Sequence, residues 1–286
     1  MKQNFLSKII AWAKQEPQIR ALILTGSRAE KRKTDELSDY DIAVICKDYK
    51  SYTKSNDWIL KLKKFIICIP EKMSFFGKKY PTRLIIFEDH TKIDFSFFPL
   101  NFIKLLSSKK NLPDQFNRGY KVILDKDGIT KKLPKPTYEG FKIKKPPKKE
   151  FLQCIDDFWF EVYHVAIYLA RQDLWHAKFR DNDIKNRFLL KMIEWNEGAK
   201  HNWNYETNSL GKRMQSWVSK KTWKSCFDIF AHFDAQDSWQ ALLKMMNLFR
   251  TISKETAKKL GYKYPEHVDT KISSFVEGLK NKAMRS

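Results

Sequence analysis

The stretch LTGSRAEKRKTDELSDYDIAVI, residues 24–45, places two aspartates at the start of an apolar run. The run DYDIAVIC predicts a strand, and residues two apart in a strand point to the same face of the sheet. Asp39 and Asp41 therefore present two carboxylates side by side, where the like charges repel and raise one pKa. A divalent cation explains this placement, because Mg²⁺ prefers hard oxygen ligands and also takes phosphate oxygens.

The pair Gly26 and Ser27 ends the preceding apolar strand, IRALILTGS, and comes before a charged segment that predicts a turn of helix. Such a turn offers backbone N–H groups and a hydroxyl to an anion, aided by the partial positive charge of a helix N-terminus. A phosphate-binding turn followed by a metal-binding aspartate pair predicts a nucleoside triphosphate site.

A third carboxylate, Asp94, lies inside the apolar run KIDFSFF. Burial of an isolated carboxylate is expensive, so a partner is expected. If this strand lies beside the strand of Asp39 and Asp41, three carboxylates converge at one edge of the sheet. Each feature alone is common, but their order along the chain is specific.

The first half of the chain predicts an α/β domain with a mixed sheet, because predicted strands and helices alternate. The linker is expected at residues 134–150, within a segment rich in lysine and proline, after a first domain at 1–133 and before a helical bundle at 151–286. The predicted elements of the first domain are a helix ending near residues 15–17, strands 19–27 and 39–46 with a helical turn between them, a helix 53–67, a hairpin of 82–89 and 92–99, a helix 100–107 and a strand 120–128.

The second half predicts helices throughout, since apolar residues recur at intervals of three and four. The segments that carry this pattern are residues 151–169, RFLLKMIEW (187–195), WKSCFDIFAHF (223–233), SWQALLKMMNLFRTISKETAKKLG (238–261) and DTKISSFVEGLKN (269–281). Gly261 is the expected C-cap of the longest helix.

The net charge of +22 in 286 residues has two interpretations. Basic surfaces attract polyanions, but the excess comes from lysine, and no cluster of arginines with interleaved aromatics is seen. We therefore favour a solvated lysine-rich surface, with nucleic acid as the less expected partner. The cysteines Cys46, Cys68, Cys154 and Cys226 form no metal or disulfide pattern. No apolar run approaches the ~20 residues of a membrane span, and the amphipathic N-terminal helix is not a signal peptide, so a cytoplasmic protein is expected.

The segment GSRA…DYDI resembles the aminoglycoside 6-adenylyltransferases, the streptomycin-modifying enzymes of the DNA polymerase beta-like nucleotidyltransferase superfamily. Later segments, including IDFSFFPL, VILDKDG, LLKMIEWNEG and LFRTISKETAKKLGYKYP, resemble the family in the same order, so the likeness spans nearly the whole chain. The resemblance implies an α/β nucleotidyltransferase domain followed by an all-α domain, and an enzyme that confers antibiotic resistance.

The resemblance also implies roles for the residues of the motif. Asp39, Asp41 and Asp94 would bind two Mg²⁺ ions, with Asp94 as the general base for the attacking hydroxyl. Gly26 and Ser27 would hold the triphosphate of ATP, with Arg28 nearby. The hydroxyl of a cationic aminoglycoside would attack the α-phosphorus and release pyrophosphate.

Lysines of the helical domain would complete the pyrophosphate clamp in such an enzyme. Two lysines stand in recognisable contexts, Lys212 in SLGKRM and Lys178 in HAKFRDND. Lys212 is the preferred candidate, because a Ser-Leu-Gly turn precedes it.

The face of the first long helix opposite its apolar stripe carries Asp157, Glu161 and His164. These carboxylates could pair with the cationic groups of an aminoglycoside through charge-assisted hydrogen bonds. An ordinary solvated helix face explains them equally well, and His164 fits a structural histidine better than a ligand.

Two other functions stay open at this point. Nucleotidyl transfer to RNA or to a protein side chain fits the positive charge, and a non-catalytic nucleotide-binding homologue would bind ATP without releasing pyrophosphate. The presence of all three carboxylates argues against the non-catalytic homologue, because three neighbouring carboxylates repel one another when no metal ion is bound. A monomer is expected.

Overall fold

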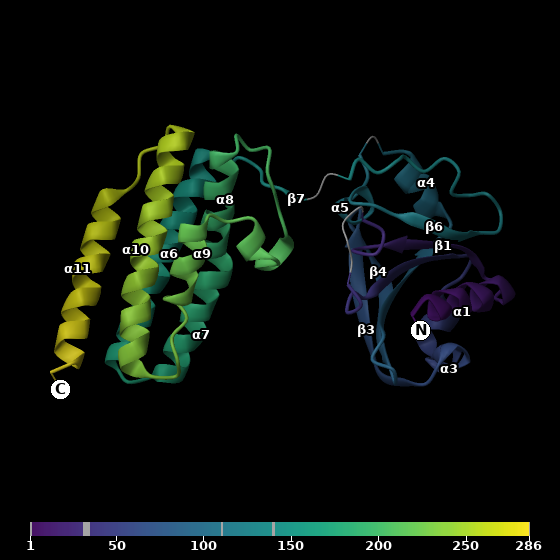
Figure 1. Ribbon diagram of the computed structural model, residues 1–286, viewed down its shortest axis with the longest axis horizontal. Coiled ribbons are helices and arrows are strands. Elements are labelled where there is room, and N and C mark those ends of the chain that lie inside the picture. Colours follow the sequence, from purple (N-terminus) through teal and green to yellow (C-terminus); the bar gives the residue numbers. More distant parts are fainter. Residues whose placement is uncertain (1, 31–34, 110, 139–140, 286) are drawn as a thin grey trace. The chain divides into compact units, whose positions relative to one another are not determined.

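The computed structural model describes residues 2–30, 35–109, 111–138 and 141–285. It divides into two units, Met1–Gly140 and Phe141–Ser286 (Figure 1). Each unit has its own buried hydrophobic clusters. The helices of the first unit are α1 (Lys2–Gln15), α2 (Lys50–Lys54), α3 (Asp57–Leu62), α4 (Asn101–Ser107) and α5 (Asp114–Asn117). Its strands are β1 (Ile19–Thr25), β2 (Tyr40–Cys46), β3 (Phe65–Phe75), β4 (Lys78–Phe87), β5 (Lys92–Pro99) and β6 (Lys121–Asp125).

The strands form one mixed sheet in the order β3-β4-β5-β2-β1-β6. Neighbouring strands are antiparallel except β2 and β5, which run parallel. The predicted α/β fold with a mixed sheet is therefore confirmed. The parallel pair matters most for function, because it sets the two aspartate-bearing strands side by side.

Helices cover both faces of this sheet. On one face, α1 buries Phe5, Ile9 and Trp12, which recur at helical spacing, and Trp12 stacks on Trp58 of α3 with ring centroids 5.2 Å apart. On the other face, Phe102 of α4 stacks on Phe98 of β5 with centroids 4.0 Å apart. Asp41 and Asp94 belong to this second face, since they alternate with the residues that the first core buries.

Two local predictions for this unit differ from the structure. The predicted helix 53–67 is two short helices, α2 and α3, and residues from Phe65 onward begin the edge strand β3. Most side chains of β3 are at least partly exposed, so the sequence shows no clear alternation there. The predicted helical turn after Gly26 and Ser27 is limited, over residues 26–30, to a single turn in which the N–H groups of Ala29 and Glu30 donate to the Gly26 carbonyl, and no helix continues from it within those residues. Residues 31–34 of that segment lie outside the described residues.

The second unit is a helical bundle, as predicted. Its elements are β7 (Phe141–Lys142), α6 (Lys148–Ala170), α7 (Leu174–Ile184), a π-helical stretch η1 (Lys185–Leu189), α8 (Leu190–Lys200), β8 (Glu206–Thr207), the 3₁₀ turns η2 (Ser209–Gly211) and η3 (Met214–Ser216), α9 (Lys220–Phe227), α10 (Ala235–Leu260) and α11 (Glu266–Ala283). The helix predicted over 223–233 ends at Phe227, and the chain then runs without helix to Asp234, which caps α10 by accepting from the N–H of Asp237.

The apolar stripe of α6 packs against α10 in the core of this unit. Phe158 and Phe249 stack with ring centroids 3.5 Å apart. At the margin of the core, Arg250 donates two hydrogen bonds of 2.6 Å to Asp269 of α11. Gly261 ends α10 in the left-handed conformation with φ of +71°, which confirms the expected cap.

No helix in the part of the chain that the structure describes is both long and apolar enough to cross a membrane.

Candidate active site

Three carboxylates converge at one end of the sheet. Asp41 of β2 is the register partner of Asp94 of β5, and Asp39 lies directly before β2. Each of the three offers an oxygen within 4.8 Å of the others. The structure thus brings together the three aspartates that the motif singled out.

Gly26 leaves room for the carboxylate of Asp41. An added Cβ at Gly26 would lie 1.9 Å from Asp41 Oδ2, and the residue has φ of +66°. Both the contact and the left-handed backbone require glycine. Gly26 therefore forms one wall of the acidic cluster, beside Ser27, which is half-buried.

Lys92 is a member of the acidic cluster that the sequence reasoning missed. Its ammonium group donates to Asp39 Oδ2 at 2.8 Å and to Asp94 Oδ2 at 2.9 Å. It stands two residues before Asp94 on the same strand, so it shares a face with that carboxylate. The spacing of Lys92 and Asp94 in the sequence KID could have indicated this contact, but the chain contains so many lysines that a single one is not distinctive.

The acidic cluster perturbs the pKa values of its members. Burial, with the charges of Asp39 and Asp94, raises the pKa of Asp41 to about 6. Burial also raises the pKa of Asp94, although the hydrogen bond from Lys92 opposes the shift. A buried carboxylate with raised pKa is suited to accept a proton from a hydroxyl.

The donor set fits a divalent cation. The three side chains supply hard oxygen ligands on one edge of a rigid sheet, as Mg²⁺ requires. Asp94 Oδ1 is buried and finds no hydrogen-bond partner among the described residues. A buried, unsatisfied carboxylate oxygen is costly, and a metal ion would satisfy it.

Arg28 contacts backbone instead of pointing freely from the turn. Its guanidinium donates to the carbonyls of Ser38 at 2.6 Å and Asp39 at 3.0 Å. It also lies over the ring of Tyr40, 4.1 Å from the centroid. These contacts join the Gly-Ser turn to the residues that enter β2, and so position Asp39.

The turn is supported from the other side by the residues before β6. Arg118 forms an ion pair with Glu30, with Nε and Oε1 3.3 Å apart. An added Cβ at Gly119 would lie 2.6 Å from the Ala29 carbonyl oxygen, so this backbone approaches the turn closely. The charge of Arg118 also acts to lower the pKa of Asp41.

The two lysines predicted for the pyrophosphate clamp lie in the helical unit. Lys178 of α7 donates to the carbonyl of Ala231 at 2.9 Å, which holds the chain between α9 and α10. Lys212 is exposed and follows the 3₁₀ turn η2. Lys212 is therefore the freer of the two to contact a ligand.

The expected acceptor-binding face of α6 is partly neutralised within its own unit. Glu161 Oε2 lies 2.7 Å from a guanidinium nitrogen of Arg180. Arg180 belongs to α7, so the residues of α6 alone do not indicate this ion pair. Asp157 accepts from Gln153 at 2.8 Å, and His164 Nδ1 lies 2.9 Å from the Phe160 carbonyl. Of the two carboxylates, Asp157 is the one that no cation pairs with among the described residues.

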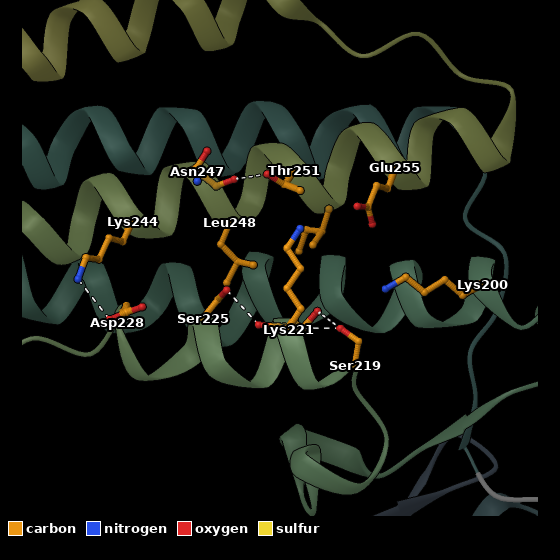
Figure 2. Close-up of a pocket in the computed structure, with 12 residues that line it drawn as sticks. Lys200, Ser219, Lys221, Ser225, Asp228, Lys244, Asn247, Leu248, Thr251 and Glu255 are labelled. Atoms are coloured by element: carbon orange, nitrogen blue, oxygen red, sulfur yellow. Dashed lines mark hydrogen bonds and ion pairs between the residues drawn. The ribbon is translucent and has the colours of Figure 1, made fainter.

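A separate pocket of about 270 Å³ lies in the helical unit between α9 and α10. Figure 2 shows Lys221 between these helices, with the pair Lys244 and Asp228 at one end. The hydroxyl protons of Ser225 and Thr251 are donated to carbonyls of their own helices. The pocket contains none of the predicted site residues.

The fold and the carboxylate cluster together define a nucleotidyltransferase-like protein. The family profile described as streptomycin adenylyltransferase matches residues 1–279. An aminoglycoside 6-adenylyltransferase of Campylobacter jejuni is 30% identical over 278 residues, which is 96% of this chain and 94% of that protein. Another of the same name from Bacillus subtilis (strain 168) is 28% identical, covering 97% of each chain. A crystal structure of an aminoglycoside 6-adenyltransferase from Bacillus subtilis covers 98% of each chain at 25% identity, with a TM-score of 0.48.

The chain belongs to the streptomycin adenylyltransferase family. This confirms the resemblance inferred from the Gly-Ser and Asp-x-Asp motif, and it confirms that the protein is an enzyme of the adenylyltransferase class.

Proposed function

We propose that the enzyme transfers AMP from ATP to a hydroxyl of a cationic aminoglycoside, with streptomycin as the first candidate, and releases pyrophosphate. The observation that carries this proposal is the convergence of Asp39, Asp41 and Asp94 beside Gly26. The names of the relatives support the acceptor class.

Mg²⁺ bound to the three aspartates would supply charge stabilisation for the attacking and leaving oxygens. Two ions are proposed, as in other two-metal phosphoryl-transfer sites. Asp39, Asp41 and Asp94 would hold them, and the Gly26–Ser27 turn would cradle the triphosphate. By holding these groups in fixed positions, the sheet would contribute to the rate through orientation of the reacting groups.

The acceptor oxygen forms a bond to the α-phosphorus of ATP while the bond from that phosphorus to the pyrophosphate oxygen breaks. Asp94 accepts the hydroxyl proton as the general base. Pyrophosphate leaves with its electron pair, and Lys212, with Lys178 as the second candidate, would stabilise its charge.

The acceptor is proposed to meet the helical unit at α6. Asp157 is the main candidate for pairing with a cationic group of the drug, with Glu161 and His164 beside it on the same helix. Because Glu161 already pairs with Arg180, its negative charge is partly neutralised, and it would attract a cationic group of the drug less strongly than Asp157.

Pyrophosphate release with ATP and Mg²⁺ across a panel of aminoglycosides tests the proposal. Asp41→Asn should reduce turnover about 100-fold or more, since metal-ion catalysis is worth several kcal/mol. Asp48→Asn is the matched control, because Asp48 follows the same strand, is exposed and undergoes the same loss of charge. Release that depends on RNA and not on any aminoglycoside would refute the acceptor, and ATP binding without release would refute the activity.

A further inference from the structure

Lys92 occupies a position in the acidic cluster that a metal ion would also favour. Its ammonium lies within 2.9 Å of oxygens on both Asp39 and Asp94. We infer that Lys92 is a tethered counter-cation, which holds Asp39 and Asp94 together in the metal-free enzyme and competes with the divalent ion for them. The inference rests on the metal site of the proposed function.

The metal-free cluster needs such a cation. Three carboxylates with oxygens within 4.8 Å of one another repel strongly. Lys92 is placed to reduce this repulsion because it stands on the face of Asp94, while Asp39 comes one residue before Tyr40, the register partner of Ile93. One ammonium thus bridges two strands that run parallel.

The same contacts oppose metal binding. A cation that Asp39 and Asp94 hold in common lies close to any ion that uses those carboxylates, and two positive charges at such separation repel. The burial of Asp94 increases the energetic cost of this competition, since its side chain is 15% exposed and its Oδ1 has no hydrogen-bond partner within the described part of the chain. Metal binding must therefore weaken or break the contacts of Lys92.

The Lys92 side chain can move away from the two carboxylates when a metal ion binds. Its side chain is 41% exposed, and a lysine stem is flexible, with an ammonium that forms no fixed bidentate geometry. Of the two acids that it contacts, Asp94 lies in β5 and Asp39 lies directly before β2. The exchange can thus occur at the side chain, without movement of the strands.

Titration of the full chain with Mn²⁺ alone tests the inference, with free Mn²⁺ measured by electron paramagnetic resonance. Lys92→Met should bind Mn²⁺ about tenfold more tightly or better than the unchanged chain, because a nearby positive charge is removed. Lys63→Met is the matched control: Lys63 pairs with Asp89 at 2.7 Å, is 36% exposed and lies outside the cluster. It should leave the Mn²⁺ affinity within about twofold. Lys92→Arg keeps the charge and should give little or no gain in affinity.

Thermal unfolding supplies a second readout. Metal-free Lys92→Met should unfold at a lower temperature than the unchanged chain, and saturating Mn²⁺ should stabilise it more, as tighter binding requires. Lys92→Gln replaces it if the methionine variant does not fold. Equal Mn²⁺ affinity in the unchanged chain and the Lys92 variant would overturn the inference while leaving the metal site intact. Failure of both to bind Mn²⁺ would overturn the metal site and the inference with it.

Discussion

Replacement of Gly26 by alanine tests whether the turn and the acidic cluster act as one structure. An added Cβ would lie 1.9 Å from Asp41 Oδ2 and 2.8 Å from its Cγ, against 3.4–4 Å for ordinary contact. The carboxylate would have to retreat by roughly 1.5 Å, and misplacement by about 1 Å can cost 10²-fold in rate. We expect Gly26→Ala to lower kcat/KM for ATP about 100-fold.

The backbone contributes a separate cost to stability. Gly26 has φ of +66°, and the left-handed conformation costs an L-residue about 1–2 kcal/mol. Gly77→Ala isolates this cost, because Gly77 has φ of +73° in the same unit and an added Cβ there meets nothing within 4 Å. Gly77→Ala should lose about 1–2 kcal/mol of unfolding free energy. Gly26→Ala should lose at least as much, because its Cβ also contacts Asp41, and only Gly26→Ala should also lose activity and Mn²⁺ affinity.

Urea unfolding and pyrophosphate release measure the two effects independently. If Gly26→Ala keeps kcat/KM within about threefold of the unchanged enzyme, Asp41 does not need its observed position and the reasoning fails. Equal losses of activity in the Gly26 and Gly77 variants would refute it as well, because backbone strain alone would then explain the result.

Two further predictions concern Arg28 and Glu194. Arg28→Lys keeps the charge but loses the contacts with both carbonyls, so kcat should fall about tenfold with little change in KM for ATP; a rise in KM alone would instead indicate direct contact with the triphosphate. Burial raises the pKa of Glu194 in α8 to about 7, above its unfolded value, so its contribution to stability is lost as pH rises from about 4.5 to 7. Glu194→Gln should therefore gain roughly 1–2 kcal/mol over the unchanged protein at pH 8, a figure reduced for the partial exposure of the side chain, and nothing at pH 4. Urea unfolding at both pH values measures this, and an equal gain at both would show that the charge is not responsible.

The acidic cluster was predictable because its geometry is nearly local. Same-face placement of Asp39 and Asp41 follows from the period of a strand, and the cost of burying Asp94 alone required a neighbour. The register that makes Asp41 and Asp94 partners is a tertiary fact, yet two apolar strands that each carry an acid have few other ways to satisfy both.

The contacts around the cluster were not predictable in the same way. Arg28 was expected near phosphate, but its partners are carbonyls ten and eleven residues later, which only the folded turn brings within reach. Strand β3 was missed because edge strands expose both faces and lose the alternation that marks a strand. The pairing of Glu161 with Arg180 depends on the packing of α7 against α6, which no pattern within α6 contains.

The pattern of charge explains why this sheet tolerates three acids at one end. Arg118, paired with Glu30, acts to lower the pKa of Asp41 from one side, and Lys92 binds Asp39 and Asp94 from the other. With Lys92 counted, the cluster of three carboxylates retains two negative charges when no metal is bound. Removal of Lys92 would leave three, so the same residue that is proposed to oppose metal binding also limits the repulsion among the carboxylates when the metal is absent. The ammonium group of Lys92 would therefore stabilise the metal-free site and, for the same reason, lower the affinity of the site for a divalent ion.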